Sequence, residues 1–359
     1  MAEKFIKNSG LINNMKIIEE GKIKLNVFEG DKISKELPVF YNPIMTQNRD
    51  YSIRLLNALD KKMMQIGLPL SGSGVRGLRF IKELSPGKIK NISFNDYSSE
   101  AVSLIKKNFK LNNLKWKSLR RKKLIDIYCY DANLFLLGSQ GFDYIDIDPF
   151  GPPIQFLDSA VRRLSRDSVL AITATDTAAL SGTYPKACWR KYWSKPLRNY
   201  MMHEIGLRIL IRRVQLIGMT YDKALVPIFS YSKDHYMRVF FKCEKSKETC
   251  NTVFKKQGML EDAGPMWLGK LWDSKLVDKM KDDDKFLNII ADESKIDQIG
   301  FYDIHQICKV EKLSVPKNEL LFERIKKKGF KVSRTHFSDK GIRSDIDYKN
   351  LVWIIKSLK

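Results

Sequence analysis

Three acidic residues stand directly after strand-like segments in the middle of the chain: Asp96, Asp131 and Asp148. In an open parallel sheet, ligands bind beyond the carboxyl ends of the strands, where such side chains can contact them. A single aspartate at a strand end is also a common turn former. Three in succession, after a glycine-rich loop, favour a nucleotide-like cofactor at this edge of the sheet.

The glycine-rich loop covers residues 71–77, and its glycines let the backbone approach a ligand closely. Arg76 stands where a pyrophosphate site would need a small residue, and no Lys-Ser or Lys-Thr pair follows, which excludes a P-loop. An arginine suits the carboxylate of an amino acid. S-adenosylmethionine carries such a carboxylate, a ribose and an adenine. Asp96 is then placed to accept hydrogen bonds from the ribose hydroxyls, and Asp131 to accept one from the adenine amine.

The segment Asp148-Pro149-Phe150-Gly151 combines an acid, a rigid proline and an aromatic ring. This combination recurs in enzymes that methylate exocyclic amines of bases. Such an amine is a weak nucleophile because its lone pair is delocalised, and a carboxylate such as Asp148 would accept its hydrogen bond and a proton. Phe150 would stack on an extruded base. In the alternative interpretation, the proline and glycine only form a turn and Phe150 fills the core.

A further segment, residues 184–198, mixes aromatic rings with cations. Cations suit phosphates and rings suit unpaired bases, so this segment is a candidate RNA-binding surface. A partly buried helix with cations that reach out to solvent explains it equally well. The candidate RNA-binding residues are Arg190, Lys191, Trp193, Lys195 and Arg198.

The elements that must position these residues alternate between helix and strand from residue 48 to 244, which predicts an α/β fold with a mostly parallel, Rossmann-like sheet. We expect helices at residues 50–67, 99–112 (capped by Ser98 or Ser99) and 153–164, and strands at 89–94, 125–130, 142–147 and 169–173.

Two flanking regions complete the predicted organisation. Residues 1–47 are expected to form a basic, strand-rich arm, with strands at 22–27 and 37–41. Residues 243–252 are polar and charged, which predicts a linker. Residues 245–359 are expected to form a smaller α+β domain that binds nucleic acid, with a helix at 315–328 and a strand at 330–335.

The composition favours a polyanionic partner. The 359 residues include 64 Lys and Arg against 41 Asp and Glu, a net charge of +23, and nucleic acid is the first candidate for such an excess. A solvated lysine-rich surface is the alternative. Five scattered cysteines and four histidines without metal-ligand spacing predict reduced thiols and no metal site. With no expected signal peptide or membrane span, we expect a cytoplasmic location.

Taken together, these motifs resemble the tRNA guanine-26 N2-dimethyltransferases, in the right order and over nearly the whole chain. The matching segments are residues 38–43, 48–50, 74–79, 95–96, 131–133, 148–151, 173–176, 233–236, 264–269 and 334–337.

The resemblance implies a methyltransferase domain that uses S-adenosylmethionine, followed by a C-terminal domain that contacts tRNA. It implies that Asp148 acts on the guanine amine with Phe150 near the base, and that the product is N2,N2-dimethylguanosine. For this chain we expect no metal and no obligate protein partner. The resemblance further implies cofactor contacts from Arg49, Arg76, Asp96, Asp131 and Ala132.

Two departures from the family pattern stand out. The family usually carries an acid at the place of Leu68, so the affinity for the cofactor is expected to differ. Some members carry a cysteine zinc cluster in the tail, whereas this chain has only Cys243 and Cys250 there, which predicts no zinc.

Three other functions share parts of this pattern. An adenine-N6 methyltransferase shares the acid-Pro-aromatic motif, but a second proline or an aromatic residue usually stands where this chain has Gly151. A non-catalytic RNA-binding protein with this fold would not need the intact Asp148 and strand-end acids. A nicotinamide dehydrogenase is disfavoured by Arg76 in the glycine-rich loop.

Overall fold

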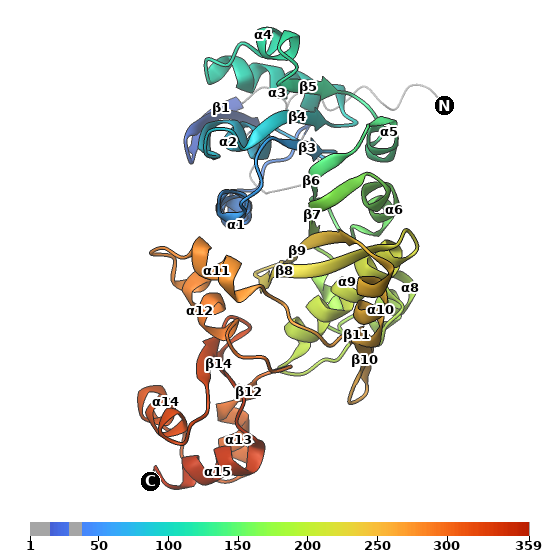
Figure 1. Ribbon diagram of the computed structural model, residues 1–359. Coiled ribbons are helices and arrows are strands. Elements are labelled where there is room, and N and C mark those ends of the chain that lie inside the picture. The colour runs from blue at the N-terminus through green and yellow to red at the C-terminus, as the bar shows by residue number, and fades with distance from the viewer. Residues whose placement is uncertain (1–14, 29–37, 359) are drawn as a thin grey trace, which may run out of the picture. The chain divides into compact units, whose positions relative to one another are not determined.

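The computed structural model describes residues 15–28 and 38–358 (Figure 1). Contacts divide the chain into two compact units, which are described separately. The first comprises Met1–Asp148 and Asp158–Leu170, and the second comprises Pro149–Leu157 and Ala171–Lys359. None of the helices in the described ranges is both long and apolar enough to cross a bilayer.

The first unit contains most of the parallel strands. Four of them follow one another in the order β5-β4-β3-β6, and each neighbouring pair is parallel. The elements of this unit are β1 (Met15–Glu20), β2 (Ile23–Phe28), the 3-10 helix Pro43–Met45, α1 (Thr46–Ala58), β3 (Met64–Leu68), α2 (Val75–Glu83), β4 (Ile89–Asn95), α3 (Ser99–Leu111), α4 (Trp116–Arg121), β5 (Ile125–Tyr128), α5 (Ala132–Gly138) and β6 (Phe142–Ile147).

The strands form because short apolar runs are buried between helices, with Ile66, Phe94 and Tyr144 fully shielded from solvent. α3 begins where predicted, since the Ser98 hydroxyl accepts a hydrogen bond from the amide of Ala101 at 3.2 Å. The predicted α/β class with a mostly parallel sheet is confirmed.

One predicted helix was wrong at its C-terminal end. The helix expected over residues 50–67 ends at Ala58, and Met64–Leu68 forms β3 instead. A short apolar run fits either a buried strand or a helix face, so periodicity alone could not separate the two. Met63, with a φ of 53°, is the last residue before β3 begins at Met64.

The second unit contains a long hairpin and the C-terminal elements. α6 (Ile154–Arg162) and β7 (Leu164–Ala174) contribute residues to both units, and the complete strand order continues from β6 as β7-β9-β8. The remaining elements are α7 (Thr177–Leu180), α8 (Pro185–Tyr192), α9 (Met202–Met219), β8 (Lys223–Lys233), β9 (Tyr236–Lys245), α10 (Lys247–Lys255), β10 (Gln257–Leu260), β11 (Ala263–Trp267), α11 (Ser274–Met280), α12 (Lys285–Glu293), β12 (Tyr302–Asp303), α13 (Ile304–Val310), α14 (Asn318–Lys327), β13 (Val332–Thr335), β14 (Ser338–Ser344) and α15 (Tyr348–Lys356).

The linker predicted at residues 243–252 is wrong. β9 continues to Lys245 and α10 follows at once, capped by the Ser246 hydroxyl, which accepts from the amide of Thr249 at 3.1 Å. Cys243 and Cys250 are both buried, so this polar stretch is the amphipathic edge of a folded region. The charged sequence resembles a loop because five of the ten side chains in this stretch are exposed.

The C-terminal elements form a small module around a three-stranded antiparallel sheet of order β12-β14-β13. α13, α14 and α15 surround an apolar core that includes Leu321, Ile325 and Leu351. The expected helix at 315–328 is present as α14, and the expected strand at 330–335 is present as β13.

A buried network of charges joins this module to α9 within the second unit. Arg343 contacts Glu204 at 2.7 Å and Glu293 at 3.0 Å, and Arg208 contacts Glu204 at 2.8 Å. Burial raises the pKa of a carboxyl, but the charges of Arg343 and Arg208 prevail and hold the pKa of Glu204 at about 2. The backbone amide of Ser232 donates to His336 Nε2 at 3.3 Å, and His336 Nδ1 contacts the carboxylate of Glu293.

The N-terminal hairpin of β1 and β2 packs on the first unit. The amide of Asn26 donates to Asn108 Oδ1 at 2.7 Å and that of Lys24 donates to Asn112 Oδ1 at 2.9 Å, which fastens β2 to α3. The strand predicted at 22–27 is present as β2. The strand predicted at 37–41 is absent over residues 38–41, and Leu37 lies outside the described residues.

Glu20, the last residue of β1, joins two buried arginines. Arg49 Nε and Nη2 donate to its two carboxylate oxygens at 2.6 and 2.5 Å, and Arg79 Nη1 donates at 3.0 Å. Burial raises the pKa of this carboxyl, yet the hydrogen bonds and charge of Arg49 outweigh it, so the pKa of Glu20 lies below its ordinary value of 4.5. The hairpin is therefore held by a charge pair that needs an ionised carboxylate.

We expect Glu20→Gln to lower the free energy of unfolding at neutral pH by about 3–5 kcal/mol, because two buried guanidinium groups lose an anionic partner. Since the folded-state pKa of Glu20 is lowered, its contribution is complete above the unfolded-state value of 4.5 and declines as the pH falls below it. Urea unfolding of both proteins from neutral pH downwards should show the difference shrinking with acid. Glu19→Gln, at an exposed neighbour, is the control, and a pH-independent difference would contradict the assignment.

Candidate active site

The loop between β3 and α2 lies at the carboxyl end of the parallel strands. Gly72 and Gly74 have φ angles of 51° and 80°, a region that side chains other than glycine rarely adopt. Gly77 is needed for another reason, since a Cβ there would collide with the ring of Phe94 as α2 packs on β4. These three glycines were predicted to let the backbone approach a ligand closely. In the structure they form a turn that leaves no side chain at these three positions.

Asp96 follows β4 and faces this loop. Its Oδ2 accepts from the amide of Gly72 at 2.8 Å, and its Oδ1 accepts from the amide of Ser98 at 3.1 Å. Each carboxylate oxygen keeps a second acceptor position. The predicted ribose acceptor is therefore fixed beside the glycine-rich turn, with capacity for two further hydrogen bonds.

Asn95, which the sequence reasoning missed as a positioning residue, ties three strand ends together. Its Nδ2 donates to the carbonyls of Pro69 and Tyr130, each at 3.0 Å, and its Oδ1 accepts from the amide of Tyr130 at 3.1 Å. The side chain is fully buried. The sequence signals were its place directly before Asp96 at the end of a strand and its membership of the family-like segment 95–96.

Asp131 caps α5, where its Oδ1 accepts from the amides of Asn133 and Leu134 at 2.8 and 3.2 Å. Over the part of the chain that the structure describes, its Oδ2 has no hydrogen-bond partner. Asp131 is exposed, and Ala132 begins the helix with its side chain buried. The predicted adenine contact thus retains one oxygen for a ligand.

Arg76 and Asp148 form an ion pair at the same sheet edge. Arg76 stands in the first turn of α2, and its guanidinium contacts the carboxylate of Asp148 directly and that of Asp146 at 3.4 Å. It also donates to Ser52 Oγ at 2.9 Å and to Asn48 Oδ1 at 3.0 Å. Arg76 was predicted to contact a cofactor, and the partner that the structure places on it is the predicted catalytic acid.

Arg49, implied as a further cofactor contact, is directed toward the N-terminal hairpin. Besides its pair with Glu20, it donates to the carbonyl of Asn42 at 3.1 Å. Its side chain is only 5% exposed. Leu68, which stands where the family usually has an acid, is buried at the end of β3.

Phe150 belongs to the second unit and lies in a short loop that is fastened to the residues after β7. The amide of Gly151 donates to Thr175 Oγ1 at 2.6 Å, and the amide of Thr175 donates to the carbonyl of Gly151 at 3.1 Å. Gly151 has a φ of 78°, and Phe150 is 45% exposed. The loop conformation thus keeps an aromatic ring accessible to solvent.

Asp176, the next residue after this contact, is held by α8. The Tyr192 hydroxyl donates to it at 2.6 Å and Lys191 Nζ at 3.3 Å. Burial, together with the charge of Asp176, raises the pKa of Tyr192 well above its ordinary value. Lys191 was predicted to bind RNA, and its charge is already matched by this carboxylate.

The other candidate RNA-binding residues differ in their surroundings. Arg190 and Arg198 are exposed. Trp193 is 54% exposed, with the guanidinium of Arg213 3.7 Å from the centre of its ring. Lys195 pairs with Asp262 at 2.8 Å. Of the five candidate residues, two arginines and one indole are therefore open to a partner.

Metal-ligand clusters and the state of the cysteines were the remaining expectations. Over the described ranges, no group of three or more His, Cys, Asp or Glu side chains could hold a metal ion. All five cysteines are free thiols, of which Cys129 is exposed and the other four are buried.

Comparisons with known proteins match this architecture over almost its full length. The family model described as N2,N2-dimethylguanosine tRNA methyltransferase matches residues 15–263 and 258–356. A tRNA (guanine(26)-N(2)/guanine(27)-N(2))-dimethyltransferase of Aquifex aeolicus is 35% identical, over 94% of this chain and 95% of the relative. A tRNA (guanine(26)-N(2))-dimethyltransferase of Methanobrevibacter smithii is 36% identical, over 96% and 98%.

Among solved structures, Trm1 from Pyrococcus horikoshii in complex with S-adenosyl-L-methionine superposes with a TM-score of 0.83 and 34% identity, covering 95% of this chain and 99% of that one. This match confirms the predicted methyltransferase sheet with additional C-terminal elements. The agreement in sequence, length and fold shows that the chain belongs to the N2,N2-dimethylguanosine tRNA methyltransferase family.

Proposed function

We propose that this protein transfers methyl groups from S-adenosylmethionine to the exocyclic N2 amine of guanine 26 in tRNA and forms N2,N2-dimethylguanosine. The observation that supports this proposal is the grouping of Asp96, Arg76 and Asp148 at one edge of the parallel sheet, in a chain of this family. Position 26 is the one that the names of the Aquifex and Methanobrevibacter relatives share, and the Aquifex name adds position 27. As a tRNA-modifying enzyme, the protein would act in the cytoplasm.

The cofactor fits the donors and acceptors of the first unit. Asp96 has one acceptor position left on each oxygen for the ribose hydroxyls, and Asp131 Oδ2 is open to the adenine amine. Arg76, which already contacts the carboxylates of Asp148 and Asp146, would take the carboxylate of the methionine part as a further partner. When bound, the cofactor supplies a methyl group on a positively charged sulfur.

Asp148 is the proposed catalytic acid–base group. The pair with Arg76 fixes the direction of its carboxylate, which would accept a hydrogen bond from the guanine amine and orient the nitrogen for attack. As the nitrogen becomes cationic, the negative charge of Asp148 would stabilise it and then accept a proton. Phe150, exposed and fixed by its loop, would stack on the base.

The proposed tRNA contacts on the second unit come from the open part of residues 184–198 and from the C-terminal domain, residues 245–359. Arg190 and Arg198 suit phosphates, and the Trp193 ring suits an unpaired base. The direct test is mass spectrometry of nucleosides from unmodified tRNA after incubation with protein and cofactor. Dimethylguanosine at position 26 is expected, and its absence with active cofactor binding would refute the proposal.

We expect Asp96→Ala to weaken binding of S-adenosylmethionine by roughly tenfold to a hundredfold, because charge-assisted hydrogen bonds to the ribose are lost, at ~1.5–3 kcal/mol. Asp96→Asn keeps an acceptor oxygen and should have a smaller effect. Isothermal titration calorimetry measures both. An unchanged affinity in folded Asp96→Ala protein would remove Asp96 from the cofactor site.

We expect Asp148→Asn to lower the rate of methyl transfer by about 10²–10⁴-fold while the affinities for cofactor and tRNA are retained, because shape and one acceptor remain but the charge is lost. Single-turnover transfer of labelled methyl groups measures the rate. Asp143→Asn, at the opposite end of the same strand, is the control and should stay near the wild-type rate. A wild-type rate in Asp148→Asn would leave Asp148 as a turn residue.

We expect Arg190→Gln and Arg198→Gln to reduce the salt dependence of tRNA binding, because each lost phosphate contact lowers the slope of log K against log salt by about 0.7–0.9. Lys191→Gln is the matched control, since Asp176 already neutralises this lysine. Filter binding over a range of salt concentrations gives the slopes. Equal slopes in all three variants would place the footprint elsewhere on the protein.

A further inference from the structure

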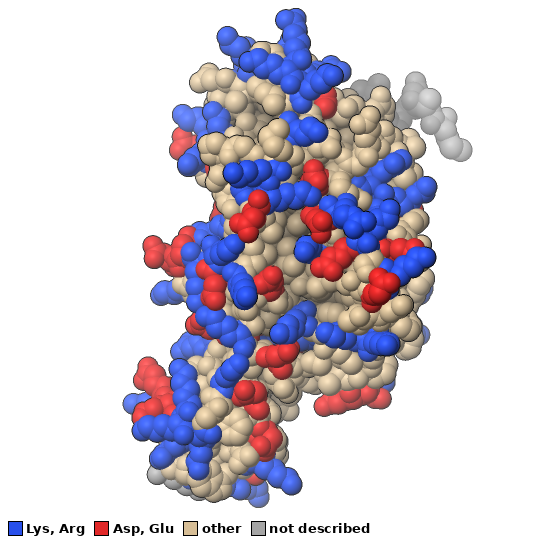
Figure 2. Space-filling view, viewed as in Figure 1, with Lys and Arg blue, Asp and Glu red and all other residues tan. Residues whose placement is uncertain are grey.

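The strongest concentration of positive charge on the chain lies outside every segment considered so far. Residues 106–123 contain nine lysines and arginines and not one aspartate or glutamate, whereas the whole chain has 64 against 41. They occupy the end of α3, the whole of α4 and the turn before β5. Figure 2 shows Lys and Arg side chains gathered over α4. This α3–α4 basic patch consists of Lys106, Lys107, Lys110, Lys115, Lys117, Arg120, Arg121, Lys122 and Lys123.

The patch is exposed and its charges are not compensated. Eight of the nine side chains are exposed and only Lys106 is half-buried. Lys106 and Lys117 lie 5.4 and 6.0 Å from the ring centre of Trp116. Across the described residues, none of the nine forms an ion pair. Elsewhere in the protein, exposed lysines such as Lys281 and Lys295 do have acidic partners.

Local structure explains only part of this charge. Cations in the last turn of a helix interact favourably with its dipole, which accounts for Lys110 in α3 and for Arg120 and Arg121 in α4. The same reasoning does not apply to Lys115 or Lys117 at the start of α4, where the dipole disfavours a cation. So many like charges on two short segments repel one another, and an external polyanion would relieve that repulsion.

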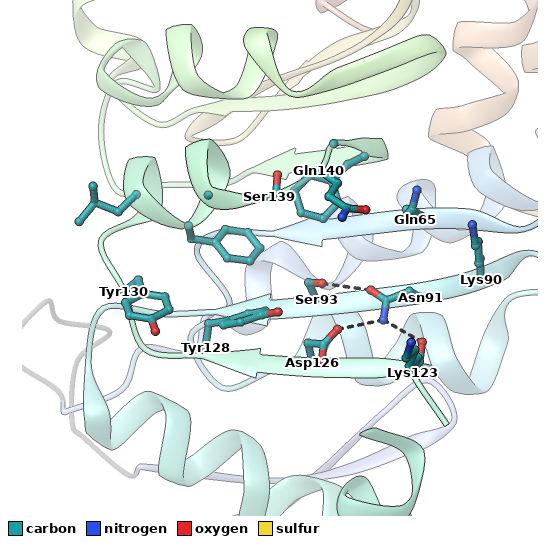
Figure 3. Close-up of a pocket in the computed structure, with 15 residues that line it drawn as sticks. Gln65, Lys90, Asn91, Ser93, Lys123, Asp126, Tyr128, Tyr130, Ser139 and Gln140 are labelled. Carbon is teal, nitrogen blue, oxygen red and sulfur yellow. Dashed lines mark hydrogen bonds between the residues drawn. The ribbon is translucent and has the colours of Figure 1, made fainter. Parts of the chain in front are cut away.

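A pocket continues the surface from the patch along the edge strand β5. It has a volume of about 600 Å³ and is bounded by β3, β4, β5 and α5 (Figure 3). Lys90 and Lys123 line one end, and Tyr128 and Tyr130 line the other (Figure 3). The two tyrosine rings are stacked at 6.0 Å. Asp126 lies between the two ends, and the cations and aromatic rings on either side of it are groups that bind a nucleic-acid strand.

The pocket also sets the patch apart from the proposed cofactor site. Lys123 precedes β5 and Asp131 follows it. The four residues of this strand span about 13 Å, so the two side chains lie at opposite ends of the strand. A folded RNA is large enough to span that distance.

We propose that the α3–α4 basic patch and the adjoining pocket bind the sugar–phosphate backbone of the tRNA substrate, away from the methylated guanine. The identity of the RNA rests on the proposed function. The surface anchors tRNA on the first unit and contributes affinity without taking part in methyl transfer.

The test uses the full-length protein and a neutralised variant, Lys117→Gln/Arg120→Gln/Arg121→Gln. The matched control is Lys62→Gln/Lys82→Gln/Arg166→Gln, which removes three exposed cations of the same unit outside the patch. Binding of full-length tRNA is measured by fluorescence anisotropy over a range of salt concentrations. The patch variant should reduce the slope of log K against log salt by about 2–3 and the control by less than about 1. Cofactor affinity should be unchanged in both.

A second RNA, a short stem-loop that presents the target guanine but lacks the rest of tRNA, distinguishes anchoring from catalysis. Its methylation should be the same in wild-type and patch variant, whereas full-length tRNA should show a raised KM and an unchanged kcat. Equal salt slopes in patch variant and control would overturn the proposal. So would loss of binding to phosphatidylserine vesicles in the patch variant with unchanged tRNA slopes, because the surface would then serve a membrane.

These outcomes are separable from the fate of the proposed function. If tRNA binding depends on the patch but no dimethylguanosine forms, the methylation reaction is refuted and the surface stands. If dimethylguanosine forms normally and binding does not depend on the patch, the surface is refuted and the reaction stands.

Discussion

The side-chain amide of Asn95 holds the edge of the sheet on which the candidate site depends. Three hydrogen bonds of one buried side chain join the end of β4 to the segments that follow β3 and β5. A buried amide with unpaired groups costs ~1–3 kcal/mol, so these segments cannot separate without leaving polar atoms unsatisfied. Asp96 follows Asn95 directly and Asp131 follows Tyr130 directly. The hydrogen bonds between Asn95 and Tyr130 therefore position both carboxylates.

The cations of this protein occupy two different environments. Arg49, Arg76 and Arg343 are buried, and each forms an ion pair with at least one carboxylate. Burying such charges is tolerated only when partners and hydrogen bonds are supplied together. The lysines and arginines of the α3–α4 basic patch lie in solvent without such partners. The excess charge of the chain therefore results mainly from surfaces and not from its interior.

Strand ends were the most predictable part of the site. β4, β5 and β6 were located within one or two residues, and the acids after them lie at the carboxyl edge as expected. Short apolar runs bounded by Asp or Asn carry this information in the sequence. The hydrogen-bond partners could not be predicted in the same way. That Arg76 contacts Asp148 follows from the packing of α2 on the sheet, which brings together residues 72 positions apart.

The failures of prediction have a common physical origin. The helix expected to reach residue 67 and the linker expected at residues 243–252 were both inferred from local composition. In each case burial in the folded protein decided the outcome. Met64–Leu68 is buried between its neighbouring strands, and Cys243 and Cys250 are buried in the second unit. The basic patch could have been recognised from its charge run, but a run alone does not reveal that its side chains lack acidic neighbours.

The unequal exposure of the five thiols gives the protein a natural attachment point for a spectroscopic probe. Cys129 alone is exposed, and its sulfur lies 3.6 Å from the carbonyl of Tyr97, the residue after Asp96. A thiol-reactive dye would therefore label one position on the native protein, between the two acids at the cofactor edge. Its emission would report events at that edge without any engineered cysteine.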